Sequence, residues 1–250
     1  MPKLPHATKR LGQNWLINPG VLDRIADELG VDTESTVVEV GPGTGALTER
    51  LAKTGARVIA IEKDRRLIDP LHELLASYSN VTIIEGDILE FNPATCGLQP
   101  GTWKLVGNIP YYLTSHLIRV ALEEWHPALT VLMVQEEVAR RMMAQPPDMN
   151  LLALGVQLYA TPTMVMRVSR GSFRPMPDVD STVIRLERRI DEPKGDRNRA
   201  LDLARTAFGH KRKQIASSVP PEMLSQAGIA STARPQELSP EDWLRLSTIR

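Results

Sequence analysis

The chain has 250 residues, 42% of them hydrophobic, and its 30 Lys and Arg balance 30 Asp and Glu, so composition gives no sign of an overall basic nucleic-acid binder. A chain of this length can bury a substantial hydrophobic core, and we expect one medium domain and a smaller one. Because Cys96 is the single cysteine and no apolar run approaches the roughly 20 residues that span a bilayer, we expect a cytoplasmic protein with no disulfide, no metal centre and no membrane partner.

The first half of the chain has the pattern of a parallel sheet. Asn18-Pro19 before VLDRIADELG predicts a capped helix with Pro at its first position and Gly30 as its stop. From residue 36 to residue 134, short β-branched runs then alternate with segments of helix length; the runs read TVVEV, RVIAI, VTIIE, WKLVG and ALTVLMV. This alternation is typical of βαβ units and predicts a parallel sheet covered on both faces.

The second half predicts a sheet edge and a separate helical domain. QEEVARRMMA predicts a short helix that Pro146-Pro147 ends, and LLALGVQLYA is a further apolar segment. TMVMRVS and STVIRLE flank the loop RGSFRPMPDVD and are expected to pair antiparallel at the sheet edge. The polar stretch DEPKGDRN marks a boundary, so we predict a first domain at residues 1–190 and a small helical domain at 191–250.

A glycine loop follows the first predicted strand. VVEVGPGTGALTERL places Gly41, Gly43 and Gly45 between a strand and a helix, where open α/β sheets bind ligands and where glycine lets the backbone approach them closely. Since Ala46 completes a G-x-G-x-x-A pattern, this spacing alone also fits an NAD enzyme, or a tight turn without a ligand.

Acidic residues end the next two predicted strands. Glu62, in VIAIEKD, can accept hydrogen bonds from both hydroxyls of a ribose, and Asp87, in IIEGDILEF, can accept from an adenine amino group. Each could instead cap the following helix. Because three consecutive strands end in groups that can bind a ligand, the pattern favours an adenosine-containing ligand.

The fourth predicted strand ends in Asn108-Ile109-Pro110-Tyr111. An adenine amine becomes nucleophilic when acceptors on its hydrogens favour a pyramidal nitrogen; the Asn108 oxygen and a carbonyl at Ile109 or Pro110 can serve. Tyr111 offers a face on which a flipped-out base can stack. The alternative is a plain turn with Tyr111 in the core, but the position at the carboxyl end of a strand favours a site.

Several of these motifs resemble known enzymes. The glycine loop with Glu62 and Asp87 resembles the S-adenosylmethionine site of class I methyltransferases, and NIPY resembles the catalytic motif of enzymes that methylate exocyclic amines. Over nearly the whole chain, KRLGQNWL, NIPYYLTS, FRPMPDVDS, AFGHKRKQI and ARPQELSPEDW together resemble the KsgA family of small-subunit ribosomal RNA adenine N6-dimethyltransferases.

This resemblance implies a fold and an activity. The fold is α/β, a Rossmann-like class I methyltransferase sheet, mostly parallel with an antiparallel edge, plus the small C-terminal helical domain. The activity is S-adenosylmethionine-dependent dimethylation of N6 on two adjacent adenosines, in a hairpin loop near the 3′ end of small-subunit ribosomal RNA. The implied partner is the precursor of the small ribosomal subunit, and we expect a monomer.

The resemblance also implies site residues. The cofactor contacts fall on Asn14, Leu16, Gly41, Glu62, Asp87 and Asn108, to which the loop adds Gly43. Residues 1–18 form a segment that closes over the cofactor. Phe173 matches an aromatic that helps to hold the target base opposite Tyr111, and because SFRP is a polar, Pro-fixed loop we expect this ring outside the core.

Local basic clusters are the predicted RNA contacts. They are Lys9, Arg10, Arg188, Arg189, His210, Lys211, Arg212 and Lys213. Such runs usually form a solvated helix face. Residues 205–213 carry four positive charges and no acid in a chain that is balanced overall, which favours RNA phosphates as their partner.

Two departures from the family leave alternatives open. Leu151-Leu152 replace an expected Tyr-Gly pair, and Tyr112 replaces an expected Asn, so the substrate preference is less well defined than the chemistry. The main alternative is an adenine methyltransferase of large-subunit RNA of the macrolide-resistance type, although ARPQELSPEDW argues against it. A ribosome-assembly factor with secondary methylation is another, and an NAD enzyme would leave NIPY without a role.

Overall fold

The computed structural model describes residues 5–8, 11–190, 194–210 and 212–249. The chain forms two compact units: unit 1 comprises Met1–Ala139 and Thr163–Arg188, and unit 2 comprises Arg140–Pro162 and Arg189–Arg250. The predicted boundary after residue 190 lies close to the second junction. Residues 140–162 differ from the prediction, because they group with the C-terminal residues. No helix in the described part of the chain is long and apolar enough to cross a bilayer.

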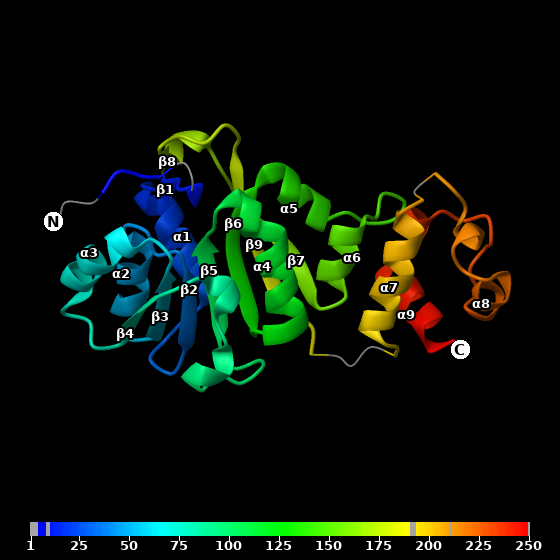
Figure 1. The fold of residues 1–250 in the computed structure, drawn as a ribbon, viewed down its shortest axis with the longest axis horizontal. Helices are drawn as coiled ribbons and strands as arrows, with labels where there is room; N and C mark the ends of the chain where they lie inside the picture. The colour runs from blue at the N-terminus through cyan, green and yellow to red at the C-terminus, as the bar shows by residue number, and fades with distance from the viewer. Residues whose placement is uncertain (1–4, 9–10, 191–193, 211, 250) are drawn as a thin grey trace. The chain divides into compact units, whose positions relative to one another are not determined.

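Unit 1 is built on a seven-stranded sheet in the order β4-β3-β2-β5-β6-β9-β7 (Figure 1). Its strands are β2 (Thr36–Val40), β3 (Arg57–Glu62), β4 (Val81–Glu85), β5 (Lys104–Asn108), β6 (Leu129–Gln135), β7 (Ala160–Val168) and β9 (Ser181–Arg188). Strands β2 to β6 pair in parallel, and β9 runs antiparallel to β6. The predicted mostly parallel α/β sheet is therefore confirmed, with β9 inside it and β7 as the edge strand.

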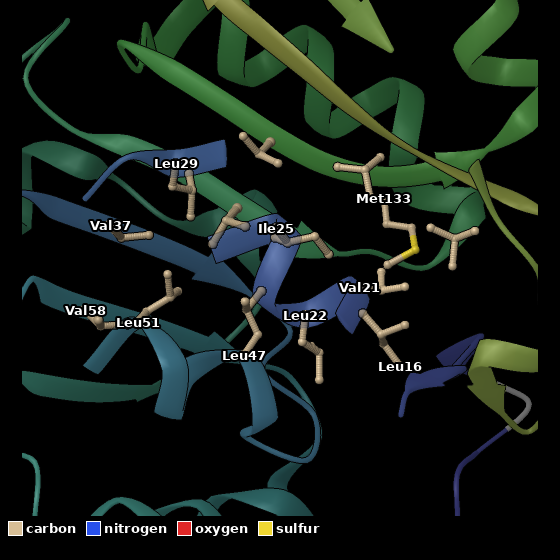
Figure 2. Packing of buried hydrophobic residues seen from close by; sticks show 14 of the residues in the cluster. Leu16, Val21, Leu22, Ile25, Leu29, Val37, Leu47, Leu51, Val58 and Met133 are labelled. Atoms are coloured by element: carbon tan, nitrogen blue, oxygen red, sulfur yellow. The ribbon is translucent and has the colours of Figure 1, made fainter. Parts of the chain in front are cut away.

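Three helices pack on one face of this sheet. They are α1 (Pro19–Leu29), α2 (Ala46–Lys53) and α3 (Arg65–Leu75). Leu22 and Ile25 of α1 and Leu51 of α2 meet strand residues such as Val58 and Met133 in one apolar cluster (Figure 2). As predicted, Asn18 caps α1, its side chain accepting from the Val21 N–H, and the helix stops at Gly30 in a left-handed conformation.

The connections after β4 carry shorter elements. The helices are α4 (Thr114–Val120), which continues into a π-helical turn (Ala121–Trp125), and α5 (Glu136–Met142). The 3₁₀ turns among the described residues include Ile88–Glu90, Pro93–Cys96, Tyr111–Leu113, Arg170–Ser172, Ile215–Ser217 and Pro235–Glu237. Ile88–Glu90 begins directly after Asp87, and Tyr111–Leu113 begins with the predicted site residue Tyr111, directly after Pro110.

Unit 2 consists of α6 (Leu151–Gln157), α7 (Arg197–Phe208), α8 (Pro221–Gln226) and α9 (Pro240–Thr248). Phe208 and the fully buried Trp243 stack with ring centroids 6.1 Å apart, and the Arg197 guanidinium lies 5.1 Å from the Tyr159 ring centroid. The Met149 N–H donates to the Gln236 carbonyl at 3.0 Å. Such contacts explain why residues 140–162 group with the C-terminal helices, which local periodicity cannot reveal.

A small two-stranded sheet was not predicted from the sequence. β1 (Trp15–Leu16) pairs antiparallel with β8 (Phe173–Arg174), so that Leu16 lies opposite Phe173. Phe173 is only 3% exposed and packs in the same apolar cluster as Leu16 and Met133. The expectation that Phe173 lies outside the core is therefore wrong: pairing with β1 turns its ring inward and leaves Arg174 exposed.

Gly107 marks the closest approach of β2 and β5. A Cβ at this position would lie 2.8 Å from the Val40 carbonyl oxygen, its neighbour in the adjacent strand. Because the Val40 oxygen is a backbone atom in the sheet interior and cannot move aside easily, Gly107→Ala should lower the free energy of unfolding by about 1–3 kcal/mol, measured by urea denaturation. The control is Gly155→Ala in α6, where a Cβ meets nothing within 4 Å. Equal stability of Gly107→Ala and wild type would contradict this packing.

Candidate active site

A cavity of about 240 Å³ opens at the carboxyl ends of β2, β3, β4 and β5. The predicted residues that line it are Asn14, Leu16, Gly41, Gly43, Glu62, Asp87, Asn108, Ile109, Pro110 and Tyr111. Parallel strands bring their carboxyl ends to one edge of a sheet, which is why residues so distant in sequence meet there. Phe173 is the one predicted cofactor or catalytic residue that does not line the cavity. The functional roles of all these residues stay predictions.

The glycine loop lies at the end of β2. Gly41 and Gly43 both have positive φ, at 62° and 56°, a conformation that favours glycine. A Cβ at Gly43 would stand 3.3 Å from the Trp15 ring, so glycine also lets the N-terminal segment pack closely on the loop. The Gly43 N–H donates to Glu62 Oε2 at 3.1 Å, which joins the loop to β3.

Glu62 ends β3 and is 5% exposed. Its Oε1 accepts from the Asp64 N–H at 2.8 Å, and its Oε2 accepts from Gly43, so each oxygen keeps one lone pair for a further donor. Burial raises the pKa of this carboxyl above its usual value, and the backbone hydrogen bonds partly offset the effect. A carboxylate held in this way can accept from two neighbouring hydroxyl groups.

Asp87 follows β4 and binds both a backbone and a side-chain donor. The Leu89 N–H donates to Oδ1 at 3.0 Å, and Lys63 Nζ lies 2.5 Å from Oδ2. Burial opposes ionisation, but the hydrogen bonds from Lys63 and Leu89 outweigh it, so the pKa of Asp87 lies below its usual value. Asp87 thus caps the following 3₁₀ turn, the alternative role considered above, and also lines the cavity.

Asn108 ends β5 with its amide orientation fixed. Nδ2 donates to the Asn14 carbonyl at 2.8 Å, which leaves Oδ1 without a hydrogen bond in the described part of the chain. The Pro110 carbonyl accepts from the Leu113 N–H at 3.0 Å. Tyr111 is half-buried, and its hydroxyl lies 2.9 Å from Oγ of the fully buried Ser181. Burial raises the pKa of Tyr111, so the ring stays neutral and anchored at one end.

Glu39, the fourth residue of β2, was not predicted from the sequence as a site residue. This carboxyl is 2% exposed and lines the cavity, and burial raises its pKa to about 7, with Thr48 lowering it in part and Glu62 raising it further. Neither Glu39 Oε2 nor the Thr48 hydroxyl has a well-formed hydrogen bond among the described residues. An acidic residue inside the apolar run TVVEV was the available signal.

The predicted RNA-binding residues fall into separate places. Lys9, Arg10 and Lys211 lie outside the described residues. Arg188 ends β9, while Arg189 in unit 2 lies 3.5 Å from Glu241 and donates to the Gln157 carbonyl. His210, Arg212 and Lys213 are exposed just after α7. A role of these residues in RNA binding stays a prediction.

This fold and this site define a class of protein. S-adenosylmethionine carries a ribose, an adenine and a positively charged methionine end, and the cavity offers an acceptor pair at Glu62, an acceptor at Asp87 and the buried acid Glu39. Together with the strand order and the glycine loop, this is the arrangement of a class I, S-adenosylmethionine-dependent methyltransferase.

Comparison with known proteins identifies the family. The sequence model of the family described as ribosomal RNA adenine dimethylase matches residues 5–250, and the chain belongs to this family. It is 40% identical to ribosomal RNA small subunit methyltransferase A of Dehalococcoides mccartyi, over 97% of this chain and 88% of that protein. The corresponding protein of Bacillus pumilus is 39% identical, over 96% of this chain and 90% of that protein.

Solved structures agree with this assignment. A dimethyladenosine transferase from Plasmodium falciparum is 28% identical, with a TM-score of 0.81 over 92% of this chain and 95% of that one. The 23S rRNA methyltransferase ErmE is also 28% identical, with a TM-score of 0.78 over 94% of this chain and 98% of that one. The protein is thus a ribosomal RNA adenine methyltransferase with S-adenosylmethionine as its cofactor.

Proposed function

We propose that the protein dimethylates N6 of two adjacent adenosines in the hairpin loop near the 3′ end of small-subunit ribosomal RNA, during small-subunit biogenesis in the cytoplasm. The observation that carries this proposal is the oriented Asn108 amide that lines the cavity, with Oδ1 left as an acceptor. The relatives named small subunit methyltransferase A support the choice of RNA, since they are more similar to this chain than ErmE is.

The strand order places the predicted cofactor-binding residues in sequence along one edge of the sheet. Because the strands run β4-β3-β2-β5, Asp87, Glu62, the glycine loop and Asn108 follow one another along the cavity. In this order Asp87 would hold the adenine, Glu62 the ribose and the loop the methionine end. The bound cofactor supplies an electrophilic methyl group.

Asn108 and a backbone carbonyl would orient the target amine. Oδ1 of Asn108 accepts one amine hydrogen, and since the Pro110 carbonyl already accepts from Leu113, we assign the Ile109 carbonyl to the other. These acceptors favour a pyramidal nitrogen and stabilise the positive charge that develops on it. The anchored Tyr111 ring offers a stacking face for the flipped-out base. Phe173, buried and paired with Leu16 of β1, would support the cavity wall rather than touch the base.

Unit 2 would contribute the RNA contacts. The exposed His210, Arg212 and Lys213 lie together after α7, and Lys211 completes this sequence cluster. Phosphate contacts of this kind make affinity depend on salt. The proposed substrate is the precursor of the small ribosomal subunit, bound by a monomer of this protein.

The test is transfer of a labelled methyl group from S-adenosylmethionine to small subunits taken from a strain that lacks this modification, with large subunits in parallel. We expect label in small-subunit RNA as N6-dimethyladenosine. Label in large-subunit RNA alone would assign the protein to the function that ErmE has by its name. Cofactor binding without label in either subunit would instead favour an assembly factor or another acceptor.

A further inference from the structure

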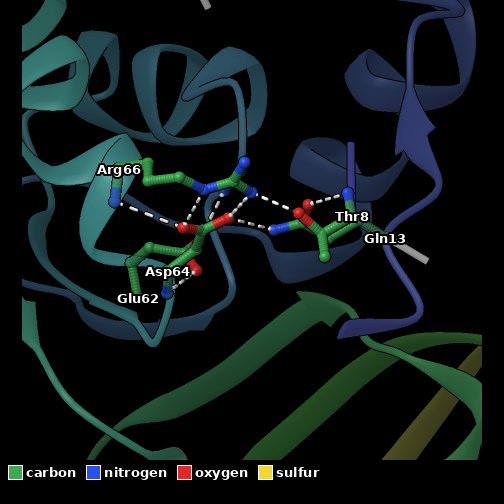
Figure 3. Close-up of polar contacts among 6 residues, drawn as sticks. Thr8, Gln13, Glu62, Asp64 and Arg66 are labelled. Carbon is green, nitrogen blue, oxygen red and sulfur yellow. Dashed lines mark hydrogen bonds and ion pairs between the residues drawn. The ribbon is translucent and has the colours of Figure 1, made fainter. Parts of the chain in front are cut away.

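A cluster of four polar residues joins the N-terminal segment to the start of α3. We call Thr8, Gln13, Asp64 and Arg66 the Asp64 cluster (Figure 3). Gln13 Nε2 donates to Asp64 Oδ2 at 2.9 Å, and the Thr8 N–H donates to Gln13 Oε1 at 2.7 Å. Arg66 donates to both Asp64 oxygens, at 2.9 and 2.6 Å, and also to the Thr8 hydroxyl. The Gln13 side chain therefore makes a hydrogen bond through its oxygen and another through its nitrogen.

Asp64 is the charged centre of this cluster. It is 5% exposed, and the Arg66 guanidinium, helped by Gln13, lowers its pKa to about 2. Asp64 is therefore ionised at neutral pH, and its contacts are charge-assisted hydrogen bonds, which are the stronger kind. Such a cluster holds a defined geometry instead of switching with pH.

The Asp64 cluster lies between the two halves of the site. On one side, the Asp64 N–H donates to Oε1 of Glu62, the predicted ribose ligand. On the other side, Gln13 directly precedes Asn14, whose carbonyl holds the Asn108 amide. A chain of contacts thus runs from Glu62 through Asp64 and Gln13 to Asn14, and from the Asn14 carbonyl to the Asn108 amide. It connects the predicted ribose ligand with the predicted acceptor of the target amine.

The segment is held differently on the two sides of Asn14. After Asn14, Leu16 is buried in the core and the Ile17 N–H donates to the Ser172 carbonyl at 2.9 Å. Before Asn14, the side chain of Gln13 is held by the polar contacts of the Asp64 cluster, so these contacts help to set where the Asn14 carbonyl stands. If that carbonyl moves, the Asn108 amide loses the contact that fixes its orientation.

We propose that Gln13, Asp64 and Arg66 are positioning residues, which hold the Asn14 carbonyl so that Asn108 presents Oδ1 to the amine that receives the methyl group. This proposal rests on the proposed function for its chemistry, but the structural link can be tested without activity. It assigns to the Asp64 cluster an effect on the methyl-transfer step itself, beyond retention of the cofactor.

The test variant is Gln13→Met, which keeps the length of the side chain and removes both hydrogen bonds. At saturating S-adenosylmethionine and RNA, kcat should fall by about tenfold to a hundredfold, since small misplacements of a reacting group have effects of this size. Gln99→Met, the same change at an exposed residue of unit 1 away from the cavity, should leave kcat unchanged.

A double-mutant cycle separates positioning from general damage. In an Asn108→Ala background, Gln13→Met should cause no further loss in single-turnover rate, because the path acts through Asn108. An equal loss in both backgrounds would overturn the proposal. So would a weaker Kd for the cofactor with unchanged kcat, because the Asp64 cluster would then serve cofactor binding alone.

Hydrogen exchange provides the readout that does not need turnover. In Gln13→Met without cofactor, backbone amides of residues 11–17 should exchange faster, while those of β2 and β3 should keep the wild-type rate and so report an intact fold. Unchanged exchange in residues 11–17 would overturn the proposal. A wild-type enzyme that fails to methylate RNA would contradict the proposed function, whereas the exchange result would still report on the Asp64 cluster.

Discussion

Asn108→Ala should lower the rate constant of methyl transfer by about 10²–10³-fold, the usual effect of removing one preorganised group that stabilises developing charge. The variant loses Oδ1, the free acceptor, together with the Nδ2 contact to the Asn14 carbonyl. The measurement is single-turnover methylation of small-subunit RNA at saturating cofactor. Binding of S-adenosylmethionine should weaken less than the rate falls, because Glu62 and Asp87 remain in the cavity.

The matched control for this variant is Asn92→Ala. Asn92 is exposed, caps a short 3₁₀ turn in the same unit and does not line the cavity, so its loss should leave the rate unchanged. Asn108→Asp offers a second comparison, since it keeps acceptor oxygens but sets one of them against the Asn14 carbonyl. Retention of more than about a tenth of the wild-type rate by Asn108→Ala would contradict the role assigned to this residue.

The residues at strand ends were predictable because each follows from a local pattern. The glycines after TVVEV, the acid after VIAI and NIPY after KLVG can each be recognised from a few neighbouring residues. The parallel pairing of the strands then brings these strand ends together at one edge of the sheet. The end of α1 at Gly30 was predictable for the same reason, because the cap and the stop lie in the chain itself.

The features that were missed depend on residues far apart in the chain. From the sequence alone, Phe173 is predicted to be an aromatic residue in a loop. Its burial depends on the pairing of β8 with β1, and β1 has only two residues and no strand-like sequence pattern. Residues 140–162 join unit 2 because Tyr159 and Met149 contact Arg197 and Gln236. The Asp64 cluster likewise needs the N-terminal segment to lie over α3 before Gln13 and Asp64 can meet. No local periodicity carries this information.

The buried carboxyl of Glu39 should make the free energy of unfolding depend strongly on pH. Below its ordinary pKa of 4.5 the carboxyl is protonated in the folded and unfolded states alike, and it adds no pH dependence. Between 4.5 and about 7 the unfolded state ionises while the folded state keeps its proton, so stability falls as the pH rises. Above about 7 both states are ionised and the cost of burying the charge stays constant.

Glu39→Gln should therefore stabilise the protein in a pH-dependent way. Glutamine resembles the protonated acid, so the variant and wild type should be about equally stable at low pH. At high pH the variant should be more stable by roughly 3 kcal/mol, at about 1.4 kcal/mol per pKa unit. Urea denaturation across this range measures the difference, and Glu73→Gln, at an exposed residue of α3, should change stability by less than about 0.5 kcal/mol at any pH.

Bound S-adenosylmethionine should reduce this difference at high pH. Its positive charge favours the ionised form of a carboxyl that lines the same cavity, so the cofactor should stabilise the wild type more than Glu39→Gln. The same denaturation series, repeated with saturating cofactor, tests this expectation. A stability difference that is independent of pH would show that Glu39 has the same pKa in the folded and unfolded states, and that contacts within the protein compensate its burial.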